Sequence, residues 1–173
     1  MHVLFVCTGN ICRSPTAERL AIAYGARSGI TDLRTSSAGT RAVLGHPIHD
    51  EAARVLSGLG GDTSNFAARQ LTPRLAGDAD LILTMTRAHR DAVLELAPRQ
   101  LKRTFTMSEA ARLVSHHGAR DVDDLAALRP QLSPIDRTDI ADPIGRDADV
   151  FTTVGARIAE LLPPILEICT RGP

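Results

Sequence analysis

The sequence predicts one α/β domain that spans residues 1–173, with a four-stranded parallel sheet, helices on both faces and an anion-binding loop after the first strand. Three observations lead to this prediction. Short apolar segments alternate along the chain with segments of helical period, which is typical of a parallel sheet covered by helices. The length of 173 residues suits one core. A tight loop with a thiol and a guanidinium at its two ends directly follows the first apolar segment.

The first half of the chain supplies two strands and two helices. Residues 3–6 are apolar and partly β-branched, so they are expected to form a buried first strand. Residues 16–21 favour a helix after the loop, and residues 33–37 suit a second strand. Residues 48–59 are expected to form the next helix, which the pair Gly60-Gly61 ends.

The other two strands are expected at residues 79–84 and 103–106. Between them, residues 87–96 have a helical pattern that Pro98 stops. In parallel sheets of this kind, ligands bind beyond the carboxyl ends of the strands. Cys7 directly follows the first strand, so the expected site is at that edge.

The last third of the chain is less regular. Residues at about 115–140 are rich in Asp and Pro, and they are expected to form a variable surface excursion near the site, with one helical turn at residues 125–128. A long amphipathic helix is expected from Asp149. The pair Pro163-Pro164 is expected to kink or split this helix.

Composition limits the possible partners and the compartment. The chain has 20 basic and 20 acidic residues, so no net charge attracts nucleic acid or a membrane surface. The first apolar segment is too short for a signal peptide, and no apolar stretch reaches spanning length. Three cysteines do not make a disulfide framework. A cytoplasmic location is therefore expected.

The loop after the first strand has the composition of a phosphate site. A strand that leads through such a loop into a helix aims successive N–H groups inward, toward a bound anion. There the thiolate form of Cys7 is favoured, which makes Cys7 the expected nucleophile. Arg13 can hold two phosphoryl oxygens in a planar fork. The expected phosphate-binding residues are Thr8, Gly9, Asn10, Ile11, Cys12, Arg13 and Ser14.

Three loop residues are expected to support the nucleophile. The Ser14 hydroxyl can donate a hydrogen bond to the thiolate, and it suits the first turn of the helix. Gly9 and Asn10 can adopt the positive φ angles that a tight anion loop requires. The Asn10 side chain can also form hydrogen bonds within the loop.

The string CTGNICRSP at residues 7–15 resembles the low molecular weight protein tyrosine phosphatase family. The resemblance extends over nearly all of residues 1–170, through the segments Ser37-Ala38-Gly39-Thr40, residues 81–86, Phe105-Thr106 and Asp142-Pro143. It implies hydrolysis of protein phosphotyrosine through a cysteinyl-phosphate intermediate, without metal or cofactor. It further implies that Ser37 braces Asn10 and that Cys12 is a redox-active, resolving thiol for Cys7. Taken alone, Cys12 can also be a small buried packing residue.

Ester cleavage needs a group that protonates the leaving oxygen. In the resembled family an Asp-Pro pair supplies this general acid, which assigns the role to Asp142. Pro143 restricts Asp142 to an extended conformation and so helps to fix its carboxyl group. Asp139 and Asp147 are the fallback candidates, although neither precedes a proline.

Substrate preference is expected to depend on Ile11 and Ile144. The apolar Ile11 favours an aromatic ring, whereas relatives that dephosphorylate protein arginine carry threonine there. Tyrosine phosphatases of the family usually place an aromatic residue where Ile144 stands, and the usual aromatic near residues 44–46 is also missing. Phosphotyrosine is the expected substrate, and phosphoarginine is the nearest alternative.

Two other classes of function fit the sequence less well. An arsenate reductase of this fold needs a relay cysteine in residues 75–95, and this chain has none there. A silent phosphate-binding module would not need the complete set Cys7, Arg13 and Asp142.

No metal and no cofactor are expected. His116 and His117 are adjacent and diverge, and the group His46, His49 and Asp50 lacks further ligands at a recognisable spacing. The expected partners are a phosphorylated protein and a cognate tyrosine kinase.

Overall fold

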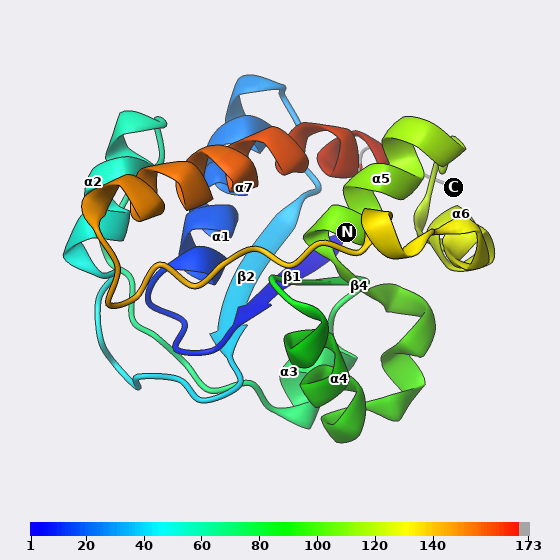
Figure 1. Cartoon of the computed structure of the whole chain (residues 1–173), viewed down its shortest axis with the longest axis horizontal. Coiled ribbons are helices and arrows are strands. Elements are labelled where there is room, and N and C mark those ends of the chain that lie inside the picture. Colours follow the sequence, from blue (N-terminus) through cyan, green and yellow to red (C-terminus); the bar gives the residue numbers. More distant parts are fainter. Residues whose placement is uncertain (170–173) are drawn as a thin grey trace.

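The structure, a computed structural model, describes residues 1–169. Its centre is a four-stranded sheet in the order β2-β1-β3-β4, and every pair of neighbouring strands is parallel (Figure 1). This confirms the predicted α/β class and the parallel sheet. The strands are β1 (His2–Cys7), β2 (Arg34–Gly39), β3 (Leu81–Thr84) and β4 (Thr104–Thr106).

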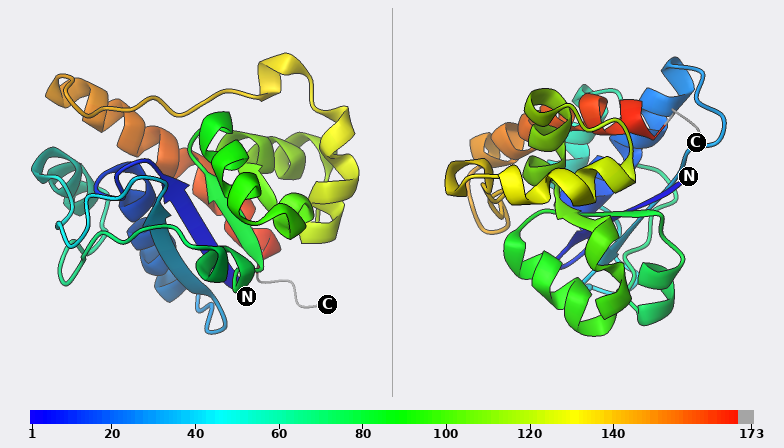
Figure 2. Two further views of the ribbon diagram at one scale, coloured as in Figure 1. Left: turned by 90° about the horizontal axis from the view of Figure 1, so that it is seen from below. Right: turned by 90° about the vertical axis from the view of Figure 1, so that its right-hand side faces the viewer.

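Helices cover both faces of the sheet (Figures 1 and 2). On one face lie α1 (Arg13–Arg27), α2 (Asp50–Gly58), α5 (Met107–His117) and α7 (Ala148–Ile168). On the other face lie α3 (Pro73–Gly77) and α4 (Arg87–Leu96). The remaining elements are α6 (Val122–Leu128) and the short 3-10 helices η1 (Pro98–Arg103), η2 (Arg129–Gln131) and η3 (Pro134–Asp136).

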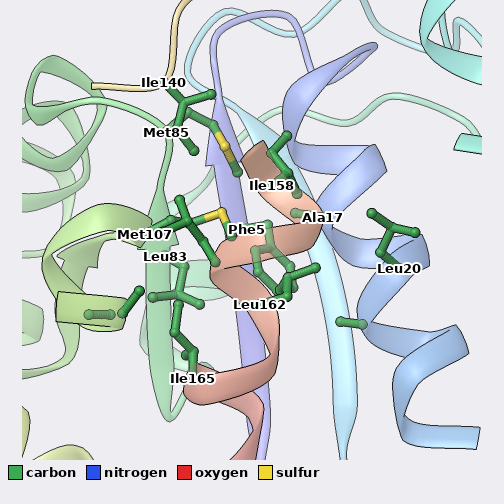
Figure 3. Packing of buried hydrophobic residues seen from close by; sticks show 14 of the residues in the cluster. Phe5, Ala17, Leu20, Leu83, Met85, Met107, Ile140, Ile158, Leu162 and Ile165 are labelled. Atoms are coloured by element: carbon green, nitrogen blue, oxygen red, sulfur yellow. The ribbon is translucent and has the colours of Figure 1, made fainter. Parts of the chain in front are cut away.

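The two layers of core follow from the alternation of side chains along β1. Val3 and Phe5 are fully buried in the larger cluster, under α1 and α7. Leu4 and Val6 are fully buried in the smaller cluster on the opposite face. Figure 3 shows Phe5 against Leu162 of α7, so the last helix closes the main core. A central strand buried on both faces places Cys7, its last residue, rigidly at the edge of the sheet.

Of the kink or split expected at Pro163-Pro164, the split is wrong. The helix α7 runs without interruption from Ala148 to Ile168, with Pro163 and Pro164 inside it. Both prolines are half-buried, whereas Leu162 and Ile165 on either side of them are buried. Burial of these apolar side chains outweighs the lost backbone hydrogen bonds, so the segment remains one helix.

The predicted irregular excursion is more helical than expected. The helix α5, which precedes most of this segment and was not predicted, begins with a capping box formed by Thr106 and Glu109 and extends to His117. The expected single turn at residues 125–128 is the second half of α6, and Leu125 is fully buried. Burial of this residue requires a helix that packs on the core. None of the helices described within residues 1–169 is long and apolar enough to cross a membrane.

Candidate active site

The carboxyl ends of the strands bring the loop after β1 against the segment after β2. Cys7 is paired with Gly39 in the sheet, and the backbone N–H of Thr40 donates to the Cys7 carbonyl at 2.9 Å. A Cβ atom at Gly39 would lie 2.4 Å from the carbonyl oxygen of Thr8, so this close approach requires glycine. Backbone N–H groups of Arg41 and Val43 donate to the Thr8 and Gly9 carbonyls. The segment after β2 is thus fixed to the loop.

Asn10 is the centre of the loop's side-chain hydrogen bonds. It is fully buried and has φ 55°, as predicted. Its Nδ2 donates to Ser14 Oγ at 2.9 Å and to Ser37 Oγ at 2.8 Å, and its Oδ1 accepts from the backbone N–H of Arg69 at 2.9 Å. The expected positive φ at Gly9 is wrong, because the turn is made at Asn10 alone within the loop.

Cys7 lies at the bottom of the loop, with only 2% of its surface exposed. Its Sγ lies 3.0 Å from Ser14 Oγ. Since Ser14 Oγ already accepts from Asn10, its own proton is available for the sulfur. Ser37 Oγ likewise accepts from Asn10 and donates to Glu18. Asn10 thus donates in two directions, to Ser37, which donates to Glu18, and to Ser14, whose hydroxyl is thereby oriented toward the sulfur.

Arg13 and Asp142 meet beside the thiol. The Arg13 side chain is buried, and its Nη2 lies 2.6 Å from Asp142 Oδ2. Its Nη1 donates to the Ile140 carbonyl at 3.0 Å. Asp142 is half exposed, and its Oδ1 accepts from the backbone N–H of Ile144 at 3.2 Å. The carboxylate is therefore held at the mouth of the site while it remains accessible to a ligand.

The fallback acids lie elsewhere. Asp139 Oδ1 accepts from the backbone N–H of Arg87 at 2.9 Å and so belongs to the start of α4. Asp147 precedes the first residue of α7 and is exposed. Neither lines the pocket that contains Cys7.

The pocket above Cys7 has a volume of about 200 Å³. Its lining residues are Cys7, Thr8, Gly9, Ile11, Cys12, Arg13, Arg41, Val43, Asp142 and Ile144. Four of these, which we call the rim, surround the mouth: Ile11, Arg41, Val43 and Ile144. The rim thus combines three aliphatic side chains with one cation.

Three residues at or near the site, Arg41, Val43 and His89, were not predicted from the sequence. The first two follow the end of β2, and the carboxyl ends of parallel strands share one edge, so their position in the chain was a usable signal. His89 lies in the first turn of α4, and its Nε2 is 2.8 Å from Thr8 Oγ1. Burial, with a smaller contribution from the charge of Arg13, lowers the pKa of His89 to about 4.

Cys12 is buried and borders the same pocket as Cys7. Burial, followed by the charge of Cys7, raises the pKa of Cys12 to about 12. The third cysteine, Cys169, is remote from this pocket and donates to the Ile165 carbonyl at 3.3 Å.

His49, one of the histidines of the candidate metal groups, has other partners. The His49 ring stacks on Phe151 with 5.0 Å between the ring centres, and its Nδ1 accepts from the backbone N–H of Glu51. Within residues 1–169, no group of three or more His, Cys, Asp or Glu side chains is placed to hold a metal ion.

Similarity to known proteins agrees with this geometry. Residues 2–126 match the family described as low molecular weight phosphotyrosine protein phosphatase. The probable low molecular weight protein-tyrosine-phosphatase AmsI of Erwinia amylovora is 31% identical over 152 residues, which cover 88% of this chain and 85% of AmsI. The corresponding enzyme Wzb of Salmonella typhi is 42% identical over 96 residues, which cover 56% of this chain and only 61% of Wzb.

Solved structures extend the similarity to nearly the whole chain. A low molecular weight protein tyrosine phosphatase from T. tengcongensis has a TM-score of 0.77 at 31% identity and covers 96% of this chain and 98% of that one. The YwlE arginine phosphatase from Geobacillus stearothermophilus has a TM-score of 0.74 at 28% identity, and the alignment covers 96% of this chain and 90% of that one. The matched family and the extent of both alignments show that the chain belongs to the low molecular weight phosphotyrosine protein phosphatase family.

Proposed function

We propose that this protein hydrolyses phosphotyrosine in proteins through a cysteinyl-phosphate intermediate. One observation carries the proposal: the Cys7 thiol, the Arg13 guanidinium and the Asp142 carboxylate line a single pocket at the end of β1. A nucleophile, a permanent cation and a proton carrier are the three groups that phosphoryl transfer to sulfur requires.

In the first step the phosphoryl dianion binds over the loop, where the N–H groups of residues 8–14 and Arg13 take its oxygens. The dianion replaces Asp142 as the partner of Arg13 and favours the binding of a proton by the released carboxylate. The Cys7 thiolate attacks phosphorus in line, and an S–P bond forms as the bond from phosphorus to the phenolic oxygen breaks. Asp142 gives its proton to that oxygen.

In the second step a water molecule attacks phosphorus. Asp142 takes a proton from the water, the S–P bond breaks, and Cys7 returns as thiolate while inorganic phosphate leaves. The Ser14 hydroxyl, 3.0 Å from the sulfur, stabilises the thiolate as attacking and leaving group. As proposed, the reaction needs no metal and no cofactor.

The alternative substrate is phosphoarginine. Ile11 and Val43 give the rim an apolar surface, which favours a phenyl ring over a charged guanidinium. The absence of an aromatic side chain at Ile144, and the similarity to a YwlE arginine phosphatase, favour phosphoarginine. Kinetics on phosphotyrosine and phosphoarginine peptides of the same sequence discriminate between the two. A higher kcat/KM on phosphoarginine would overturn the preference proposed here.

We also propose that the reaction takes place in the cytoplasm, on a phosphorylated protein supplied by a cognate tyrosine kinase. The free thiols Cys7 and Cys12 support a reducing compartment. Relatives named protein-tyrosine phosphatases support a phosphoprotein substrate.

Cys12 is proposed to act as a resolving thiol. A peroxide oxidises the Cys7 thiolate to a sulfenic acid, and attack by Cys12 on that sulfur forms a disulfide and releases water. The negative charge of Cys7 helps to raise the pKa of Cys12 in the resting enzyme, and oxidation of Cys7 removes this charge. With Cys12→Ser, mass spectrometry should find Cys7 as sulfinic or sulfonic acid after peroxide treatment. If a thiol reductant restored the activity of the peroxide-treated wild type and of Cys12→Ser equally, this role of Cys12 would be contradicted.

The proposed function is tested with p-nitrophenyl phosphate. We expect turnover that persists in a chelator and is lost in Cys7→Ser. Rapidly quenched reactions should contain phosphorus covalently bound to Cys7. Phosphate binding without turnover would identify a silent binding module instead, and thiol-dependent reduction of arsenate would identify a reductase.

A further inference from the structure

The contact between His89 and Thr8 joins α4 to the phosphate loop. His89 Nε2 and Thr8 Oγ1 are 2.8 Å apart, although the two residues are 81 positions apart in the chain. Thr8 directly follows Cys7 and lines the pocket, whereas His89 is buried and does not line it. His89 therefore reaches a ligand only through the Thr8 hydroxyl.

The position of His89 is fixed from several sides. It lies in the first turn of α4, where its backbone N–H donates to Thr86 Oγ1 at 3.2 Å. The same turn is tied to the segment before Asp142, because Asp139 accepts from the backbone N–H of Arg87. The ring is thus held against Thr8 by a helix whose start is anchored on both sides.

The surroundings of the ring determine which nitrogen carries its proton. Nδ1 of His89 is buried and has no hydrogen-bond partner among residues 1–169. An unpaired buried N–H costs more free energy than an unused lone pair, so Nδ1 is the bare nitrogen. Burial and the charge of Arg13 lower the pKa of His89 to about 4, so the ring is neutral near pH 7. The proton is therefore on Nε2, which donates to Thr8 Oγ1.

We infer that His89 is a positioning residue for phosphate binding: it donates to the Thr8 oxygen and thereby leaves the Thr8 hydroxyl proton to be donated to a phosphoryl oxygen in the pocket. No other acceptor for that proton is found among the described residues. The hydroxyl then adds a side-chain donor to the ring of backbone N–H groups. This inference rests on the proposed function for its ligand, a phosphoryl group.

The test compares conservative and disruptive variants at both positions, with the dissociation constant of inorganic phosphate as the main measurement. Thr8→Val keeps the shape of the side chain and removes the hydroxyl, so phosphate should bind about tenfold to a hundredfold more weakly. Thr8→Ser keeps the hydroxyl and should bind nearly as the wild type does. His89→Met removes the donor and should weaken binding about twofold to tenfold. In His89→Gln the side-chain amide can replace the Nε2–H donor, so phosphate should bind nearly as tightly as it does to the wild type.

The double variant separates positioning from packing. In Thr8→Val the hydroxyl is gone, so His89→Met should cause no further loss of phosphate affinity. Additive losses in the double variant, or unchanged affinity in Thr8→Val, would overturn the inference. If His89→Met fails to fold, the phosphate affinity of Thr8→Val still tests whether the Thr8 hydroxyl binds phosphate. Because phosphate binding is measured without turnover, its result is independent of p-nitrophenyl phosphate hydrolysis, which tests the proposed function.

Discussion

The floor and the rim of the pocket are built differently. By the floor we mean Cys7 and Arg13, which line the pocket, and Asn10, which supports the loop; each is at most 3% exposed and has a side-chain hydrogen-bond partner within the protein. On the rim, Val43 is 37% exposed and Ile144 43%, and no hydrogen bond or ion pair of the Arg41 side chain is found among residues 1–169. The floor is preorganised for one chemical group, the phosphoryl group of the proposed substrate. Residues of the rim, in contrast, can be substituted without disturbing the floor.

This difference separates the chemistry from the choice of substrate. A change on the floor removes a bond from a buried network, so we expect it to affect every substrate and, at Asn10, the stability of the fold. A change on the rim alters only the surface that meets the leaving group.

The largest effect is expected from loss of Asp142, the proposed general acid, which lies between the floor and the rim. Asp142→Ala should lower kcat by about 10²–10⁴-fold on phosphotyrosine, the range for loss of a general acid. The effect should be smaller on p-nitrophenyl phosphate, because its leaving group needs less help from a proton. Steady-state kinetics on both substrates measure this. Asp147→Ala, an exposed aspartate outside the pocket, is the control. Equal losses on the two substrates would argue that Asp142 has another role.

Asn10→Ala should destabilise the whole protein. The change leaves Ser14, Ser37 and the backbone N–H of Arg69 without their partner in a buried site. The expected loss is about 2–4 kcal/mol in the free energy of unfolding, measured with urea. Asn65→Ala is a matched control, since Asn65 also has a positive φ, of 51°, but is exposed. A similar loss in both variants would assign the effect to backbone strain instead of the network.

The floor was the more predictable region because its residues are close in sequence. Cys7, Asn10 and Arg13 lie within one short loop, and the geometry of that loop follows from an apolar strand, a residue that tolerates positive φ and a helix start. The place of Asp142 beside Arg13, 129 positions away, was expected only through the family resemblance.

Two of the errors, at His89 and at Pro163-Pro164, have a common cause in long-range contacts. The contact of His89 with Thr8 depends on how α4 packs against the loop, so no spacing of residues in the sequence predicts it. The unbroken α7 depends on burial against the sheet, which propensity at Pro163 does not reveal. The missed helix α5 is different, because the pattern Thr106 to Glu109 was a readable capping box.

A change at the rim should shift preference without loss of phosphate binding. Ile144→Tyr should raise kcat/KM on phosphotyrosine peptides about twofold to tenfold through contact of the two rings. Ile11→Thr removes an apolar contact and should lower kcat/KM on the same peptides about tenfold. The inhibition constant of inorganic phosphate should stay unchanged in both variants, since neither side chain takes part in the hydrogen bonds of the floor. A large change in that constant would mean that floor and rim are coupled.

The smallest effect concerns the cation on the rim. Arg41 is exposed beside the pocket, and its backbone N–H is fixed to the Thr8 carbonyl at 3.0 Å, so its guanidinium can reach a substrate residue next to the phosphotyrosine. Peptides with a neighbouring Asp should have a kcat/KM up to about fivefold above peptides with Asn, as exposed ion pairs are weak. Arg41→Gln should abolish this difference, and so should high salt in the wild type. A difference that persists in high salt would require a buried contact, and the rim could not then be an independent, solvent-exposed surface.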